Sequence, residues 1–268
     1  MRKYLVFQLY GPLASWGDIA VGETRPSALT PAKSAVFGLI AAALGLKRPD
    51  TVATEEERAD WESRHAALAQ GYGLAVSMQA LGVPLSDYHT AQVPSSGTGR
   101  NRRTFLTRRD ELTWLPRAKL NTILSRREYR QDAFATCALW NRANAPYPLA
   151  EIRDKLLEPH FVLYLGRKSC PLALPLQPVL KTAASIEEAL ADSDLKKVLS
   201  DLWKDKTAKR LQSKFSQDEG WLLWDTDAET GLTAEQRITR RDLPLSRRRW
   251  QFSVREEYRA SWPAGDES

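Results

Sequence analysis

Four consecutive residues combine the groups that bind phosphate: Gly166, Arg167, Lys168 and Ser169 supply a glycine, two cations and a hydroxyl. They follow the apolar stretch 161–163, which we expect to be a strand. A tight turn here would present backbone N–H groups and positive charge to a phosphate. By itself, a glycine with two basic residues between strands more often marks a solvated turn. The segment therefore predicts phosphate binding only in combination with other signals.

The histidine with the most suggestive surroundings is His89, in the run DYHTAQ. If exposed, Tyr88, His89 and Thr90 would stack on bases and donate to phosphates. His89 could also serve as an acid or base in metal-independent RNA cleavage, although no second positioned group can be identified. A structural or turn-forming role is the alternative. His65 is expected at the surface or boundary of a helix.

Positive charge is concentrated between residues 100 and 130, where ten cations face three acids in a chain of net charge +6. Aromatic residues are interleaved with these cations. A groove for single-stranded nucleic acid uses this combination, with charge for the backbone and flat rings for the bases. A solvated surface loop is the alternative. The cations of this segment expected to contact RNA are Arg102, Arg103, Arg108, Arg109, Arg126 and Arg127. Arg248, in a second basic cluster beside Trp250, is a further candidate.

Several other classes of protein are disfavoured. The sequence contains no Walker motif, no GxGxxG after a strand and no GxSxG, so we expect neither a nucleotide cofactor nor a hydrolase triad. Two cysteines, Cys137 and Cys170, lack metal-ligand spacing and are expected to be packed, and no metal site is predicted. The longest apolar stretch, 35–46, is too short to span a bilayer. We therefore expect a soluble cytoplasmic protein without a cofactor.

The pattern of apolar residues, caps and turn signals gives an α+β chain. A helix should start after Thr30 as its N-cap and end at Gly45, and a second should start at Thr54 with a capping box. Residues 82–132 form a long connection with few apolar positions, which is typical of a functional or disordered segment. The other expected helices lie at 148–157 and 185–215, and the other expected strands at 4–10, 74–81, 133–140, 221–226 and 247–259. The tail 260–268 is expected to be frayed.

Seven blocks resemble, in order and approximate spacing, the CasD family, the subunit that holds the 5′ end of the guide RNA in the type I-E CRISPR surveillance complex Cascade. The blocks are QLYGPLASWG, TRPS, TPAKSAVFGLIAAALG, DYHTAQ, REYRQDAFATCALW, YLGRKSCPL and RRWQFSVREEY. They cover most of the chain, and seven ordered matches are more specific than any one of them. The sequence departs from the family pattern at 82–123 and 185–215.

This resemblance implies a modified ferredoxin-like or RNA-recognition-motif core, with a protruding basic hairpin, the "thumb", at about 87–130. The core with its thumb would occupy residues 1–157. A smaller β-rich part would occupy 158–268, with a helical insert at about 185–215.

The resemblance also implies a function. The chain would be a non-catalytic subunit that grips the 5′ handle of the crRNA, contacts the adjacent backbone subunit and the large subunit, and meets target DNA only through the complex. The alternative is a metal-independent endoribonuclease that processes CRISPR precursor RNA, and a generic single-stranded RNA-binding protein is a third, weaker reading.

The implied handle site can be placed on residues of this chain. Lys33 and Ser34 would open the first helix, whose free N–H groups suit a phosphate, and Arg25 lies in the preceding loop. Residues 166–169 would form the second wall. Tyr129 would flank the thumb base, with core packing as its alternative role.

Overall fold

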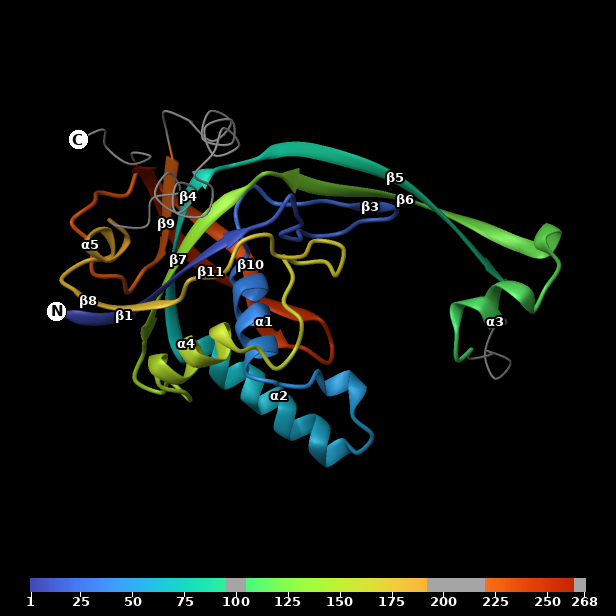
Figure 1. Cartoon of the computed structure of the whole chain (residues 1–268), viewed down its shortest axis with the longest axis horizontal. Coiled ribbons are helices and arrows are strands. Elements are labelled where there is room, and N and C mark those ends of the chain that lie inside the picture. The colour runs from blue at the N-terminus through green and yellow to red at the C-terminus, as the bar shows by residue number, and fades with distance from the viewer. Residues whose placement is uncertain (95–104, 192–219, 263–268) are drawn as a thin grey trace.

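The computed structural model describes residues 1–94, 105–191 and 220–262. Its centre is a seven-stranded antiparallel sheet (Figure 1). The strands lie in the order β10 (Gln236–Ser246), β11 (Gln251–Trp262), β9 (Gly220–Asp225), β4 (Tyr72–Ala80), β7 (Phe134–Asn141), β1 (Arg2–Tyr10) and β8 (Val179–Ala183). Because β9 pairs with β4 and β8 pairs with β1, strands from the two expected parts of the chain share one sheet.

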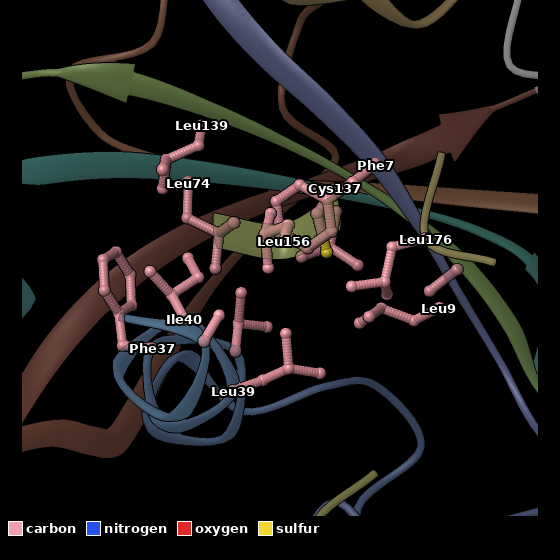
Figure 2. Packing of buried hydrophobic residues seen from close by; sticks show 14 of the residues in the cluster. Phe7, Leu9, Phe37, Leu39, Ile40, Leu74, Cys137, Leu139, Leu156 and Leu176 are labelled. Atoms are coloured by element: carbon pink, nitrogen blue, oxygen red, sulfur yellow. The ribbon is translucent and has the colours of Figure 1, made fainter. Parts of the chain in front are cut away.

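Helices α1 (Lys33–Ala43), α2 (Glu55–Gln70) and α4 (Leu149–Leu157) contribute to one core on one side of this sheet. Figure 2 shows Phe37 and Ile40 of α1 packed toward Leu74 and Cys137 of the sheet. The short helix α5 (Ile186–Leu190) packs in a second cluster that includes Trp140. Since β1 and β7 are buried on both faces, their sequences are almost continuously apolar rather than alternating.

The start of α1 differs from the prediction. Ala32, not Thr30, is the N-cap, and no side chain from the neighbouring sequence caps the helix. Instead the backbone N–H of Lys33 donates to Asp242 Oδ2 at 2.7 Å, across 209 residues of sequence. The predicted end is confirmed, because Gly45 adopts a φ of 77°, the left-handed conformation that glycine favours after a helix.

A β-bulge in β10 places Asp242 at the N-terminus of α1. Arg240 lies opposite Arg255 of β11, but Leu243 lies opposite Ser253, so two residues of β10 face one of β11. The bulge interrupts the alternation of side chains, and Asp242 is buried with 6% exposure. A strand residue thereby caps a helix from the other half of the chain.

A long hairpin projects from the body of the protein (Figure 1). It consists of β5 (Val83–Pro94) and β6 (Leu120–Gln131), which pair along their full length. Its base is extended by β2 (Leu13–Ala14) and β3 (Thr24–Arg25), and α3 (Arg108–Thr113) and the short 3-10 helix Arg117–Lys119 follow at its far end. The expected thumb segment is thus a paired ribbon.

Two expectations concern the second helix and the segment after α4. The capping box at Thr54 is confirmed, since Thr54 Oγ1 accepts from the N–H of Glu57 and the Glu57 carboxylate accepts in return. The strand expected at 161–163 is wrong, because this segment is irregular and only the isolated bridge between Tyr164 and Pro171 follows it.

The C-terminal region contains more structure than was predicted. The single strand expected at 247–259 is in fact the turn and second arm of the β10–β11 hairpin, and β11 continues to Trp262, so 260–262 are not frayed. Of the helical insert expected at 185–215, the part from 192 onward lies outside the described residues.

Candidate nucleic-acid interface

The turn at 164–171 is held against strand β2 and the residue after it. Leu165 N–H donates to the carbonyl of Cys170 at 2.8 Å, and Ser15 N–H donates to the carbonyl of Leu165 at 3.0 Å. Gly166 adopts a φ of 85°, and a Cβ there would lie 1.7 Å from the carbonyl oxygen of Ser15. The glycine is therefore required for close packing between two backbone segments.

The two cations of this turn have different surroundings. Arg167 donates from Nη1 to the carbonyl of Glu128 and from Nη2 to that of Arg25, both at 3.1 Å, and its guanidinium lies 4.7 Å from the ring centroid of Tyr129. Lys168 and Ser169 are exposed. Arg167 thus connects the turn to the hairpin base, whereas the Lys168 ammonium has no partner among the described residues.

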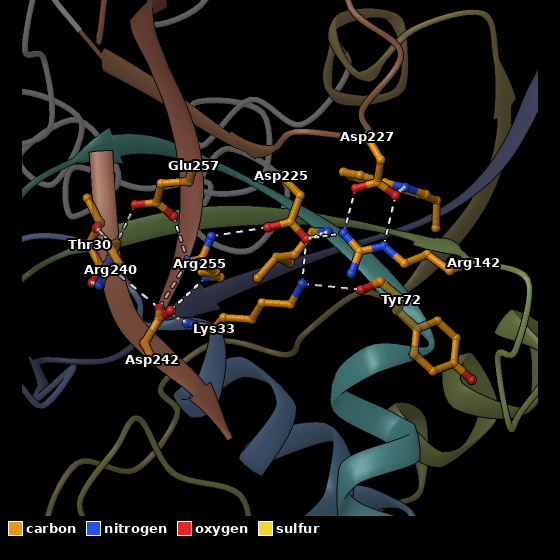
Figure 3. Close-up of polar contacts among 12 residues, drawn as sticks. Thr30, Lys33, Tyr72, Arg142, Asp225, Asp227, Arg240, Asp242, Arg255 and Glu257 are labelled. Carbon is orange, nitrogen blue, oxygen red and sulfur yellow. Dashed lines mark hydrogen bonds and ion pairs between the residues drawn. The ribbon is translucent and has the colours of Figure 1, made fainter. Parts of the chain in front are cut away.

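Two predicted RNA-binding side chains are buried. Lys33 is 1% exposed, and its ammonium pairs with Asp225 and donates to the carbonyl of Tyr72 at 3.3 Å (Figure 3). The prediction that Lys33 contacts phosphate is therefore wrong, and the adjoining N–H of α1 is occupied by Asp242. Tyr129 is 8% exposed and belongs to the core, which is the alternative role considered for it.

Lys33 is part of a buried ionic network that sequence analysis missed (Figure 3). Arg255 pairs with Asp225 at 3.1 Å, with Asp242 at 2.6 Å and with Glu257 at 2.6 Å. Positive and negative groups are equal in number; they are Lys33, Arg142, Arg240 and Arg255 with Asp225, Asp227, Asp242 and Glu257. Although burial alone would raise it, the hydrogen bonds from Arg255 hold the pKa of Asp242 below its usual value. The network ties α1 to β9, β10 and β11.

Antiparallel pairing divides the predicted hairpin residues between two faces. Tyr88 lies opposite Arg126, whereas His89 lies opposite Ser125 and Asp87 lies opposite Arg127. Directly opposite residues share a face and neighbours in a strand do not. Tyr88 and Arg126 are therefore adjacent on one face with Thr90, and His89 and Arg127 lie on the other.

The far end of the hairpin carries further predicted cations. Arg108 pairs with Glu111 and donates to the carbonyl of Gln92, while Arg109 is exposed. Arg102 and Arg103 lie outside the described residues.

Two other candidates have guanidinium groups that contact other parts of this chain. Arg25 is exposed and donates to the carbonyls of Gly22 and Thr24 at 2.6 and 3.0 Å. Arg248 pairs with Glu55 of α2, and its N–H donates to Glu62 at 3.1 Å. The Arg248 side chain is consequently directed to α2.

An open groove of about 2110 Å³ begins beside the 164–171 turn and follows α1 to the β10–β11 hairpin. Ser34 and Lys168 are the predicted site residues whose side chains line it, and Gly166 contributes backbone. Six cations that the prediction did not select also line the groove: Lys47, Arg48, Arg240, Arg241, Arg247 and Arg259. Arg247 belongs to the basic run beside Trp250 that the sequence shows. Which arginine of this run faces the groove depends on the conformation of the turn between β10 and β11.

Two other structural observations concern the residues of the described ranges. No helix there is both long and apolar enough to cross a membrane. Within the same ranges, no group of three or more His, Cys, Asp or Glu side chains is arranged to hold a metal ion. Both cysteines are buried, as predicted.

The fold and groove define a mixed α and β protein built on a large antiparallel sheet, with a basic hairpin at one end. A model of the CRISPR-associated Cas5 family matches residues 4–258, and the chain belongs to this family. It is similar to the CRISPR system Cascade subunit CasD of Escherichia coli (strain K12), with 34% identity over 177 residues, which cover 66% of this chain and 70% of that protein. The predicted resemblance to CasD is confirmed.

Two solved structures share the fold. A chain of a CRISPR RNA-guided surveillance complex superimposes with a TM-score of 0.62 at 20% identity, covering 97% of this chain and 90% of that one. A crystal structure of a Cas protein superimposes with a TM-score of 0.54 at 22% identity, covering 99% and 98%. The mixed fold is therefore shared with CRISPR-associated proteins.

Proposed function

We propose that this chain is a non-catalytic crRNA-binding and assembly subunit of a soluble Cascade complex, and that it holds the 5′ handle of the crRNA. Membership in the Cas5 family and the similarity to a Cascade subunit support this proposal. The observation that carries it is the position of the open groove. The groove is lined by Lys47, Arg48, Lys168 and Arg247, and it begins where Arg167 joins the 164–171 turn to the hairpin base. An RNA strand could therefore pass from the groove onto the hairpin.

The hairpin provides the second contact surface. Tyr88 is 62% exposed and lies beside Arg126, so a ring and a cation are offered together to a base and its phosphate. At the far end, Leu106 is fully exposed and Trp114 is 43% exposed. Apolar side chains in such positions suit a protein partner. We assign this end to the adjacent backbone subunit; the large subunit would lie beside the body of the chain, and target DNA would be met only through the complex.

A ferredoxin-like core agrees with this function. The elements β1, α1, β4, β7, α4 and β8 occur in this order along the chain, with α2 and the strands of the hairpin and its base inserted between them. Their strands lie in the order β4, β7, β1, β8 within the sheet. This order supports our proposal of a ferredoxin-like core, because the βαββαβ arrangement of that fold has the same strand order and two crossover helices on one face. We infer that β9, β10 and β11 extend this core at the β4 edge.

The test is co-expression with the other Cascade subunits and a CRISPR array. A tag on this chain should recover the complex together with a short RNA of uniform 5′ end, and Arg126→Ala should reduce the RNA retained at moderate salt. Arg153→Ala on α4 removes the same charge elsewhere and should leave retention unchanged. Recovery of the complex with RNA of random 5′ ends would contradict the proposal.

The endoribonuclease alternative predicts a different result. The purified chain would cleave labelled repeat RNA in EDTA, and His89→Ala would abolish cleavage. We expect no specific cleavage, because His89 forms no hydrogen bond or ion pair with a carboxylate or a second histidine in the described ranges. Asp87 shares its hairpin face but lies opposite Arg127.

A further inference from the structure

The turn between β10 and β11 contributes residues to the groove and also contacts α2. Arg247 and Trp250 line the groove, whereas Arg248 is held by Glu55 and Glu62 of α2. Trp250 adopts a φ of 52°, which is rare for a bulky residue and persists only where the surroundings impose it. The turn therefore has a fixed conformation that directs Arg247 and Trp250 to the groove.

The Arg247 guanidinium is incompletely partnered. Its Nη2 donates to the carbonyl of Ser34 at 3.0 Å, but its Nε is buried without an acceptor in the described part of the chain. No carboxylate there forms an ion pair with it. Burial, and secondarily the nearby Arg48, lower the pKa of Arg247, although the charge of Glu62 opposes this. Arg48 donates to Asp50 from Nε at 3.1 Å and from Nη2 at 2.6 Å. A second guanidinium near Arg247, beside an open groove, can still bind a phosphate oxygen through its remaining N–H groups.

Trp250 offers a flat surface next to these cations. The ring is 55% exposed, and the Arg48 guanidinium lies 5.0 Å from its centroid. An exposed indole ring that is already held by a cation is a stacking platform for a base.

We propose that Arg247, Arg48 and Trp250 form a subsite for one nucleotide of single-stranded RNA, with the base stacked on Trp250 and its phosphate bound by the two arginines. The inference rests on the proposed RNA-binding function and adds a contact on the α2 side of the groove. Lys168 lies on the hairpin side, so the bound strand would run the length of α1. An acidic peptide would use the arginines but would gain less from the ring.

The experiment uses the chain assembled with its partner subunits and crRNA. RNA retained per complex is measured over a series of salt concentrations for Arg247→Gln and Trp250→Leu. Arg249→Gln is the matched control, because Arg249 belongs to the same turn, is exposed and does not line the groove. Trp250→Tyr keeps a ring at the stacking position.

We expect Arg247→Gln and Trp250→Leu to weaken RNA retention about tenfold, and Arg247→Gln to lower the salt slope by about one. Arg249→Gln and Trp250→Tyr should stay within about threefold of the wild type. Ultraviolet cross-linking of the unaltered complex should also place a nucleotide adduct on Trp250, a readout that does not depend on any variant folding.

Three results would overturn the subsite. If Arg126→Ala weakens retention but Arg247→Gln and Trp250→Leu behave like Arg249→Gln, the subsite is wrong and the proposed function stands. If the wild-type complex retains no RNA, both fail. If these variants impair subunit assembly while RNA binding is unchanged, the groove here receives a protein segment instead.

Discussion

Lys33 Nζ and the Asp225 carboxylate form an ion pair in which both side chains are almost completely buried, at 1% and 4% exposure. Asp225 also accepts from Arg142 and Arg255, and the backbone N–H of Leu74 donates to it at 3.2 Å. The pair therefore joins α1 to two adjacent strands of the sheet.

Replacing Lys33 with methionine should destabilise the fold, because a buried carboxylate loses one of its cations. Loss of an isolated buried partner costs about 3–5 kcal/mol, and the remaining arginines at Asp225 reduce our expectation to about 2–3 kcal/mol. Urea unfolding monitored by circular dichroism measures the change. Lys155→Met, at an exposed position of α4, should change stability by less than about 0.5 kcal/mol. Equal effects of the two substitutions would show that the buried pair is unimportant.

Substituting Gly166 with alanine tests the packing of the 164–171 turn. The new Cβ would meet the Ser15 carbonyl, so the turn must shift as well as tolerate a positive φ. Gly17→Ala is the matched control, since Gly17 has a φ of 63° with no atom within 4 Å of a new Cβ. We expect Gly17→Ala to cost about 1–2 kcal/mol and Gly166→Ala to cost at least about 1 kcal/mol more, in the same unfolding measurement. Equal unfolding free energies of the two variants would argue against a tight contact between Gly166 and the Ser15 carbonyl.

Substituting the two cations of the 164–171 turn should have different effects, one on RNA affinity and the other on stability. Lys168→Ala should lower RNA affinity and reduce the salt slope by about one, without a change in unfolding. Arg167→Ala should lower the free energy of unfolding by about 2 kcal/mol, because two hydrogen bonds and the contact with Tyr129 are lost. Fluorescence anisotropy with handle RNA and chemical denaturation provide the two readouts. The reverse assignment of effects would refute this division of roles.

Acid should destabilise the protein partly through His65. Burial, and secondarily the charge of Arg247, lower the pKa of His65 below its usual value, although its contact with the Lys47 carbonyl opposes this. The unfolded chain therefore binds a proton more readily, so stability is lost as the pH falls from about 6.5 through the folded pKa. Unfolding free energies at pH 7.5 and 5.5 should differ less in His65→Gln than in the wild type. An unchanged difference would exclude His65 as a contributor.

Local sequence signals predicted much of the secondary structure. The capping box at Thr54 and the glycine at 45 act within a few residues, so their consequences could be derived from neighbours alone. The capping of α1 by Asp242 could not, because the two groups are 209 residues apart and meet only through a bulge in β10. His65, expected at the surface or boundary, is 8% exposed, and it lies near enough to Arg247, far along the chain, for that charge to affect its pKa.

The candidate site was predicted in part. The basic segments that border the groove were found by composition, but composition does not reveal which side chain of a run is exposed. Lys33 proved buried, and Arg248 pairs with α2 while its neighbour Arg247 lines the groove. The separation of Tyr88 from His89 follows from the alternation of side chains in any strand, but their positions opposite Arg126 and Ser125 require the register of β5 with β6.

The position of β9 has a consequence for how the protein is made. This strand lies in the interior of the sheet between β4 and β11, yet it is contributed by residues 220–225, late in the chain. During synthesis the earlier strands can assemble first, but β4 must keep an unpaired edge until β9 emerges from the ribosome. An open apolar edge is a site for association with other chains. Nascent chains truncated before residue 220 should therefore aggregate or recruit chaperones, and the sheet is completed only after residues 220–262 have been synthesised.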